Sequence, residues 1–278
     1  MVTVGVLALQ GGFSEHLGSL QKAAKYLTKT RSPASATHAA FQFIEVRTPE
    51  QLASCDALVI PGGESTTLSL VAAQSGLIEP LREFVKIDKK PTWGTCAGLI
   101  LLSEEASATK RGGQELIGGL DVKVHRNHFG RQMESFVTNL ELPFLSQTLS
   151  QSSNDGMNDT QAVPFPAVFI RAPVVDQLLT NIQSIDGKLD DVSLSKLVPD
   201  GKLKPAREKV EILAILAGRH DSNKKAAAGN ARPVSPEGAG DIVALRQGNV
   251  FGTSFHPELT DDIRIHVWWL DQVTERKR

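Results

Sequence analysis

The chain has 278 residues, of which 41% are hydrophobic, and its 30 Lys and Arg side chains nearly balance 31 Asp and Glu for a formal net charge of -1. This length and composition allow one large buried core or two small ones. The charge balance, without a basic stripe, argues against a nucleic-acid partner, and no apolar run is long enough to cross a membrane.

Cysteine usage and the first residues bear on the cellular compartment. Cys55 and Cys96 are the two cysteines, too few for a disulfide framework. The opening residues lack the basic lead of a signal peptide. We therefore expect a cytoplasmic protein, with a single domain over residues 1–278.

The N-terminal part alternates apolar runs rich in β-forming residues with helical segments. Residues 2–9 predict a strand that ends at Gln10-Gly11-Gly12, and Ser14 is expected to cap the helix that follows. Residues 41–46 and 56–60 predict two further strands. This rhythm predicts an α/β fold with a doubly wound, mostly parallel sheet flanked by helices, in which sites gather beyond the carboxyl ends of the strands.

The third expected strand ends in a glycine pair, in Pro61-Gly62-Gly63-Glu64-Ser65-Thr66-Thr67, ahead of a helix expected over residues 67–74. Two glycines before a helix can turn N–H groups outward, which suits an anion or a developing oxyanion. A Gly-Gly pair before a Ser or Thr cap is also a common loop. The position of the glycine pair at the end of a strand favours the anion or oxyanion site over a simple loop.

One cysteine stands between two glycines ahead of an apolar run, in Gly94-Thr95-Cys96-Ala97-Gly98. Glycine two places on either side of a nucleophile lets the chain turn sharply from strand into helix, because no Cβ clashes. Cys96 would then stand at a helix N-terminus, where free amides and the helix dipole favour the reactive thiolate. The alternative is a small buried thiol before a core helix.

Past residue 112 the sequence becomes irregular, with an antiparallel strand pattern. His125 and His128 lack a third ligand at a useful spacing, so we expect no metal site. Arg126 lies among small and aromatic neighbours, which suits a carboxylate ligand, although an exposed arginine fits the pattern equally well.

Several polar stretches interrupt segments that are typical of a core. They are expected to be surface insertions because their composition offers no apolar face, and the last is expected to be disordered. These stretches lie near residues 28–40, 146–163, 186–207 and 220–240.

The closing stretch predicts a β-hairpin, with residues 242–247 and 250–255 joined by the turn Gly248-Asn249. The second strand delivers His256-Pro257-Glu258 at its end. Residues two apart in an extended chain point to the same side, so Glu258 can reach the His256 ring, fix its tautomer and stabilise its cation. A lone tripeptide of this kind is otherwise a turn.

Six stretches, in this order, resemble those of a class I glutamine amidotransferase, and more narrowly the glutaminase subunit of pyridoxal 5'-phosphate synthases. The resemblance implies the flavodoxin-like, three-layer fold of that class, with the hairpin carrying the His-Pro-Glu end of a triad. His128 departs from the small residue that is usual in the family. The matching stretches are residues 5–11, 61–67, 94–102, 126–132, 169–173 and 253–259.

The resemblance implies that the chain hydrolyses L-glutamine to L-glutamate and ammonia with a Cys-His-Glu triad. Cys96 would attack the carboxamide and form a glutamyl thioester, His256 would protonate the leaving ammonia, and Glu258 would orient His256. The amides of Gly63 and Ala97 would hold the oxyanion.

The resemblance also implies the binding partners. Glutamine would be bound by Gly63, Glu64, Ser65, Arg126, Ile170 and Arg171, and Gln10 would lie near the nucleophile. No cofactor or metal is implied. The chain shows no phosphate-binding or dinucleotide motif of its own, so we expect an acceptor enzyme to use its ammonia. The resemblance implies that this acceptor is a barrel-shaped pyridoxal 5'-phosphate synthase subunit in a hetero-oligomer.

Two other classes remain open from the residues. A free-standing cysteine hydrolase of related fold, such as a peptidase or γ-glutamyl hydrolase, would use the same triad and release glutamate from peptides. A non-catalytic binding subunit would be kept for its partner surface, but the presence of Cys96, His256 and Glu258 argues against it.

Overall fold

The computed structural model describes most of the chain and leaves seven gaps, counting the C-terminal residue. The expected insertions lie largely within these gaps, and His128 also lies outside the described residues. The described ranges are residues 1–30, 40–107, 114–126, 135–145, 163–179, 208–216 and 240–277.

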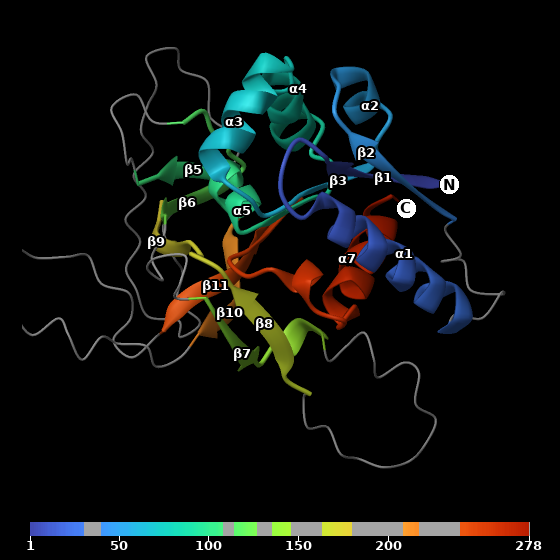
Figure 1. The fold of residues 1–278 in the computed structure, drawn as a ribbon, viewed down its shortest axis with the longest axis vertical. Helices are drawn as coiled ribbons and strands as arrows, with labels where there is room; N and C mark the ends of the chain where they lie inside the picture. Colours follow the sequence, from blue (N-terminus) through green and yellow to red (C-terminus); the bar gives the residue numbers. More distant parts are fainter. Residues whose placement is uncertain are drawn as a thin grey trace, which may run out of the picture.

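A ten-stranded sheet forms the centre of the molecule (Figure 1). Its strands are β1 (Val2–Leu7), β2 (Phe41–Val46), β3 (Ala57–Ile60), β4 (Thr92–Thr95), β5 (Ser103–Ala106), β6 (Leu120–His125), β9 (Val174–Leu178), β10 (Val210–Leu216), β11 (Asp241–Gln247) and β12 (Val250–Thr253). Their order is β2-β1-β3-β4-β12-β11-β9-β6-β5, with β10 also paired to β11. Strands β7 (Phe136–Leu140) and β8 (Phe165–Phe169) form a separate antiparallel pair.

The direction of pairing changes along the sheet. From β2 to β12 every neighbouring pair is parallel, whereas β11 pairs antiparallel with β12, β9 and β10. At the far edge β6 is antiparallel to β9 and parallel to β5. The predicted mostly parallel sheet is therefore confirmed, as is the predicted hairpin of β11 and β12.

Helices cover both faces of the sheet and make three layers (Figure 1). The helices are α1 (Phe13–Thr30), α2 (Pro49–Ala53), α3 (Ser65–Gln74), α4 (Ile78–Arg82), α5 (Ala97–Leu102) and α7 (Arg264–Arg276), with a π-helical turn η1 (Glu83–Ile87) and a 3-10 turn η3 (Pro257–Leu259). Helices α1 and α7 belong to one core, and α2 to α5 to the other.

Alternation along the strands explains the two cores. Val4 and Val6 of β1 join the core under α1 and α7, whereas the next residue, Leu7, joins the core under α3 and α4. Successive side chains of a strand point to opposite faces, so a central strand buried on both faces needs apolar residues at every position.

The order of the parallel strands determines where the loops meet. The chain leaves β1 to form β2 on one side and crosses back to β3 on the other, so the loops after β1 and β3 diverge at a switch point. The loop after β3 contains Gly62 and Gly63, and the loop after β1 contains Gln10. The polar loops predicted from the sequence therefore share one edge of the sheet.

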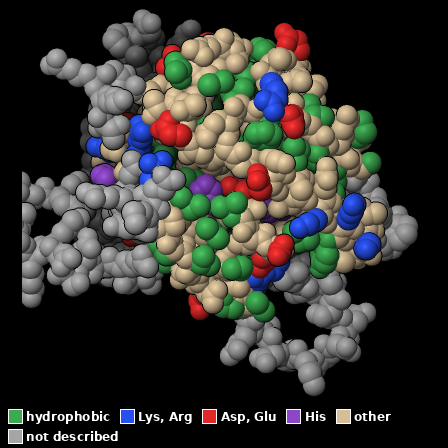
Figure 2. Space-filling view, viewed as in Figure 1, with side chains coloured by type: hydrophobic (Ala, Val, Ile, Leu, Met, Phe, Trp, Pro, Cys, Tyr) green, Lys and Arg blue, Asp and Glu red, His purple; other side chains and the backbone are tan. Residues whose placement is uncertain are grey.

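The distribution of charge and hydropathy can be followed over the described residues. On the face shown in Figure 2, acidic and basic side chains of the described residues are interspersed. No helix within the described ranges is long and apolar enough to cross a membrane.

Candidate active site

Cys96 occupies the single position between β4 and α5. Its backbone has φ 47° and ψ −100°, outside the ordinary regions for a residue with a side chain. The Cys96 amide donates to the carbonyl of Thr253 at 2.8 Å, which fixes the turn to β12. The side chain is 6% exposed. The predicted sharp turn from strand to helix is confirmed, and its strain lies at the cysteine itself.

The flanking glycines are required by close packing, with neither at positive φ. A Cβ added at Gly94 would lie 2.5 Å from the carbonyl carbon of Gly98, and one at Gly98 would overlap the carbonyl oxygen of Ile60. The start of α5 is thus pressed against the ends of β3 and β4. This contact holds Cys96 at the loop edge of the sheet.

The sheet register explains how His256, which lies 160 residues further along the chain, comes close to Cys96. Thr253, at the end of β12, is the parallel partner of Thr95 at the end of β4. The chain therefore leaves both strands at the same edge. His256 follows three residues later, and its amide donates to the carbonyl of Val168 in β8 at 2.8 Å.

His256 and Glu258 form a buried pair, with Nδ1 of His256 2.7 Å from Oε1 of Glu258. Their exposed fractions are 8% and 5%. The predicted contact is confirmed, but the predicted extended backbone is wrong: Pro257–Leu259 is the 3-10 turn η3, so the carboxylate folds back toward the ring. Since Nδ1 faces Glu258, Nε2 is left for Cys96.

The ionisation of this pair is coupled to Cys96. Burial alone would lower the pKa of His256, but the charge and hydrogen bond of Cys96, together with Glu258, raise it to about 10. Burial would raise the pKa of Glu258, but His16 and His256 hold it well below its ordinary range. The site therefore favours an imidazolium at His256 beside a carboxylate at Glu258.

The loop after β3 is tied to the loop after β1. The amide of Gly12 donates to the Gly62 carbonyl at 3.1 Å, and the Gln10 side-chain oxygen accepts from the Glu64 amide at 2.9 Å. A Cβ at Gly62 would overlap the His256 ring. Gly62 therefore lies directly against the histidine, and Gly63 lies against Gln10.

Helix α3 begins earlier than predicted and has a different cap. It begins at Ser65, and the carboxylate of Glu64 accepts from the amides of Thr66 at 3.2 Å and Thr67 at 2.7 Å. A carboxylate at this position satisfies two free amides and complements the helix dipole, so it displaces the predicted start at Thr67. Similarly, α1 begins at Phe13, so Ser14 lies inside the helix and does not precede it.

The remaining predicted binding residues converge on the same edge. Nη2 of Arg126 donates to the Thr66 hydroxyl at 3.1 Å, which places the guanidinium beside the Glu64 loop. The carbonyl oxygen of Ile170 lies 3.9 Å from Sγ of Cys96. Arg171 follows it with φ 44°. The side chain of Ser65 bonds to Gln114, a neighbour that the sequence did not single out.

Two histidines that received no role from the sequence lie beneath the site. His16 of α1 and His266 of α7 are both fully buried. Each packs its ring near edge-on against Trp93 of β4, at centroid distances of 5.4 and 5.0 Å. The sequence contained one indication for His16. It lies at helical spacing with the apolar residues Leu20 and Ala23, which predicts that its side chain faces inward.

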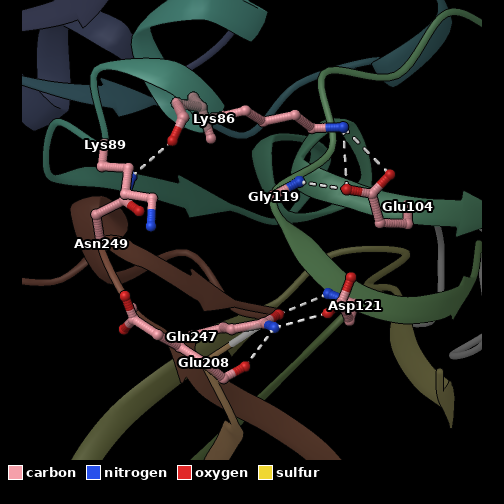
Figure 3. Close-up of a pocket in the computed structure, with 10 residues that line it drawn as sticks. Lys86, Lys89, Glu104, Gly119, Asp121, Glu208, Gln247 and Asn249 are labelled. Carbon is pink, nitrogen blue, oxygen red and sulfur yellow. Dashed lines mark hydrogen bonds and ion pairs between the residues drawn. The ribbon is translucent and has the colours of Figure 1, made fainter. Parts of the chain in front are cut away.

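A hollow of about 250 Å³ lies at the opposite end of the same strands (Figure 3). Its wall includes Gly248 and Asn249, which precede β12, whereas Cys96 follows the end of β4. Several polar groups there contact one another: Lys86 lies 3.0 Å from Glu104, and the Gln247 amide donates to Asp121 at 2.8 Å. This hollow is separate from the cysteine and its histidine.

No three His, Cys, Asp or Glu side chains within the described ranges gather as a metal site. The groups around Cys96 are instead those of acyl transfer. They comprise a thiol, an imidazole with a carboxylate behind it, and backbone amides at a glycine loop and a helix start.

Comparisons with known proteins agree with this chemistry. The model of the SNO glutamine amidotransferase family matches residues 6–216 and 219–275. The chain is 38% identical over 274 residues to a protein of Arabidopsis thaliana named probable pyridoxal 5'-phosphate synthase subunit PDX2, covering 99% of this chain and 87% of that protein. It is 36% identical to pyridoxal 5'-phosphate synthase subunit PdxT of Herpetosiphon aurantiacus, covering 97% and 99%. A crystal structure of a glutamine amidotransferase, 32% identical, superposes with a TM-score of 0.60 over 97% of this chain and 98% of that one.

Proposed function

Because the chain belongs to the SNO glutamine amidotransferase family, we propose that it is the glutaminase subunit of a pyridoxal 5'-phosphate synthase, with Cys96, His256 and Glu258 as its catalytic triad. The observation that supports the triad is the strained turn at Cys96 next to the buried His256–Glu258 pair. We also propose that residues 1–278 form a single glutaminase domain.

The proposed reaction passes through a glutamyl thioester. The Cys96 thiolate attacks the carboxamide carbon of glutamine, and the amides of Gly63 and Ala97 hold the oxyanion. The C–N bond breaks as His256 gives its proton to the departing ammonia. Water then loses a proton to His256 and attacks the thioester, which releases glutamate and restores the thiolate.

Glutamine would be held by the loops around the cysteine. Arg126, next to Thr66, supplies a guanidinium for the α-carboxylate. The Glu64 loop and the Ile170 carbonyl supply acceptors for the α-amino group. Gln10 holds the Glu64 amide, so it positions this loop. Ser65 and Arg171 complete the proposed binding set.

The proposed partner is the barrel-shaped synthase subunit, to which ammonia passes. Several relatives are themselves named as synthase subunits, which supports an assembly of two kinds of chain. The Gly62–Gly63 peptide has no Cβ on either side, so docking could turn its N–H toward the thioester at little steric cost. We expect the isolated chain to hydrolyse glutamine slowly and the complex to hydrolyse it faster.

Ammonia release from free glutamine, measured with and without the synthase subunit, tests this proposal. The matched control is Cys96→Ala in the same complex. The proposal requires ammonia that depends on Cys96 and increases with added synthase. Full activity that no amount of synthase changes would contradict the partner, and glutamate release from γ-glutamyl peptides alone would favour a free-standing hydrolase.

A further inference from the structure

The carboxylate of Glu258 has a second contact, on the side away from His256. Its Oε2 lies 3.3 Å from Nε2 of His16, an ion-pair distance between two fully buried groups. The same nitrogen lies 3.2 Å from the Thr95 hydroxyl, next to the nucleophile. No residue within the described ranges gives Oε2 a hydrogen bond, so its contact with His16 is one of distance and charge. His16 therefore stands between the carboxylate and the end of β4.

His266 contacts the other nitrogen of the His16 ring. Its Nε2 lies 3.1 Å from Nδ1 of His16, and both rings rest against Trp93. Helices α1 and α7, which carry these two histidines, pack side by side on one face of the sheet (Figure 1). The His16 ring thus reaches the carboxylate from the face of the sheet opposite α5, and His266 lies behind it.

Burial of two imidazoles in a helix interface is unfavourable unless their nitrogens have partners. Leu20, one turn along α1, fills the same interface with an apolar side chain, so packing alone does not require a histidine at position 16. A carboxylate only accepts hydrogen bonds, so a hydrogen on Nε2 of His16 makes the 3.3 Å contact with Oε2 attractive, while the same nitrogen bonds to the Thr95 hydroxyl. This contact restrains the second oxygen while Oε1 stays on His256.

We propose that His16 is a positioning residue of the glutaminase site, which holds Glu258 in place through Nε2, and that His266 fixes the His16 ring. The proposal rests on the proposed function, because Glu258 matters only if His256 is the acid and base. It extends the site from three residues to a buried series that runs Cys96, His256, Glu258, His16, His266.

The test uses the full chain in complex with the synthase subunit and compares His16→Leu with His16→Gln. Glutamine keeps an N–H donor at about the position of Nε2, whereas leucine keeps the bulk and loses the donor. Leu20→Ala is the matched control, since it removes packing from the same helix without touching Glu258. The measurements are kcat, KM and the pH dependence of kcat/KM.

We expect His16→Leu to lower kcat by about 10- to 100-fold with KM nearly unchanged, the order of effect expected for losing a buried polar contact to a charged group. His16→Gln should recover most of this loss, and Leu20→Ala should lower the melting temperature while leaving the pH profile in place. Equal losses in His16→Gln and His16→Leu, or an unchanged kcat in His16→Leu, would overturn the proposal.

A second measurement is independent of glutamine turnover. The rate of Cys96 alkylation by iodoacetamide, in a Cys55→Ser background, reports the thiolate that His256 stabilises. It should fall in His16→Leu and recover in His16→Gln, and equal rates in all three chains would refute a positioning role. A chain that releases no ammonia with His16 intact would instead refute the proposed function, and the alkylation rates would still decide the role of His16.

Discussion

Gly98 of α5 lies against the backbone of Ile60 in β3, so closely that a Cβ at position 98 would overlap the Ile60 carbonyl oxygen. This backbone contact brings the start of α5 onto the strand that leads into Gly62 and Gly63. It therefore sets the distance between the cysteine turn and the glycine loop.

Gly98→Ala should lower the free energy of unfolding by about 1–3 kcal/mol, because a carbonyl oxygen cannot yield as a side chain can. It should also reduce glutamine hydrolysis, since α5 must shift and Cys96 shifts with it. Urea denaturation and ammonia release measure the two effects. Gly18→Ala is the matched control: Gly18 lies within α1 with nothing near its added Cβ, so alanine should stabilise by about 0.5–1 kcal/mol. A neutral Gly98→Ala would contradict the packing argument.

Cys96→Ser should remove glutamine hydrolysis, whereas Cys55→Ser should leave it nearly intact. Cys55 is buried far from the loop edge, and burial raises the pKa of its thiol to about 11, so it stays protonated and unreactive. Ammonia release by the two purified variants with the synthase subunit measures the difference. Similar losses in both variants would show that the nucleophile has been wrongly assigned.

His256→Asn should be nearly as damaging as Cys96→Ser, and Glu258→Gln should be milder. In the proposed mechanism His256 moves the proton in both steps, whereas Glu258 acts through orientation and charge on Nδ1. Values of kcat for the two variants in the complex provide the comparison. If Glu258→Gln were the more severe, the order of roles would be reversed.

The stability of the folded chain should fall as pH rises from about 7 to about 10. The pKa of His256 is raised from 6.5 to about 10, so between these values the folded state keeps a proton that the unfolded state has lost. The stabilisation is fully present below pH 6.5 and is lost as pH passes through 10. Urea unfolding at a series of pH values measures this slope, and His256→Asn should flatten it. An equal slope in His256→Asn would assign the effect to other groups.

The stretch near residues 220–240 should be replaceable by a short Gly/Ser turn. Its composition offers no core face, and the strands on either side begin and end together, because Leu216 of β10 is the register partner of Asp241 in β11. Shortening a loop changes closure entropy by only about 0.6 kcal/mol per halving. Thermal melts and ammonia release should therefore stay close to those of the full chain. A melting temperature lowered by many degrees would show that the stretch packs on the body.

Local patterns predicted much of the fold. The second strand was predicted from its pattern of apolar residues, and the β11–β12 hairpin from its Gly-Asn turn. The turn at Cys96 was predicted from the small residues on either side of the cysteine. These signals act over a few residues, so they can be read without knowing what packs nearby. The errors were also local: Glu64 replaced the expected start of α3 at Thr67, and η3 replaced an extended His256–Glu258 segment.

The sequence by itself determined the candidate groups of the site: a cysteine at a sharp turn, a histidine with a carboxylate two residues on, and a glycine loop after a strand. The tertiary structure alone decided which residues meet. Thr95 and Thr253 become partners only through the sheet order, and His16 reaches Glu258 only because α1 and α7 pack on the same face. No local pattern encodes such pairings, because their free energy comes from burial shared between segments far apart in the chain.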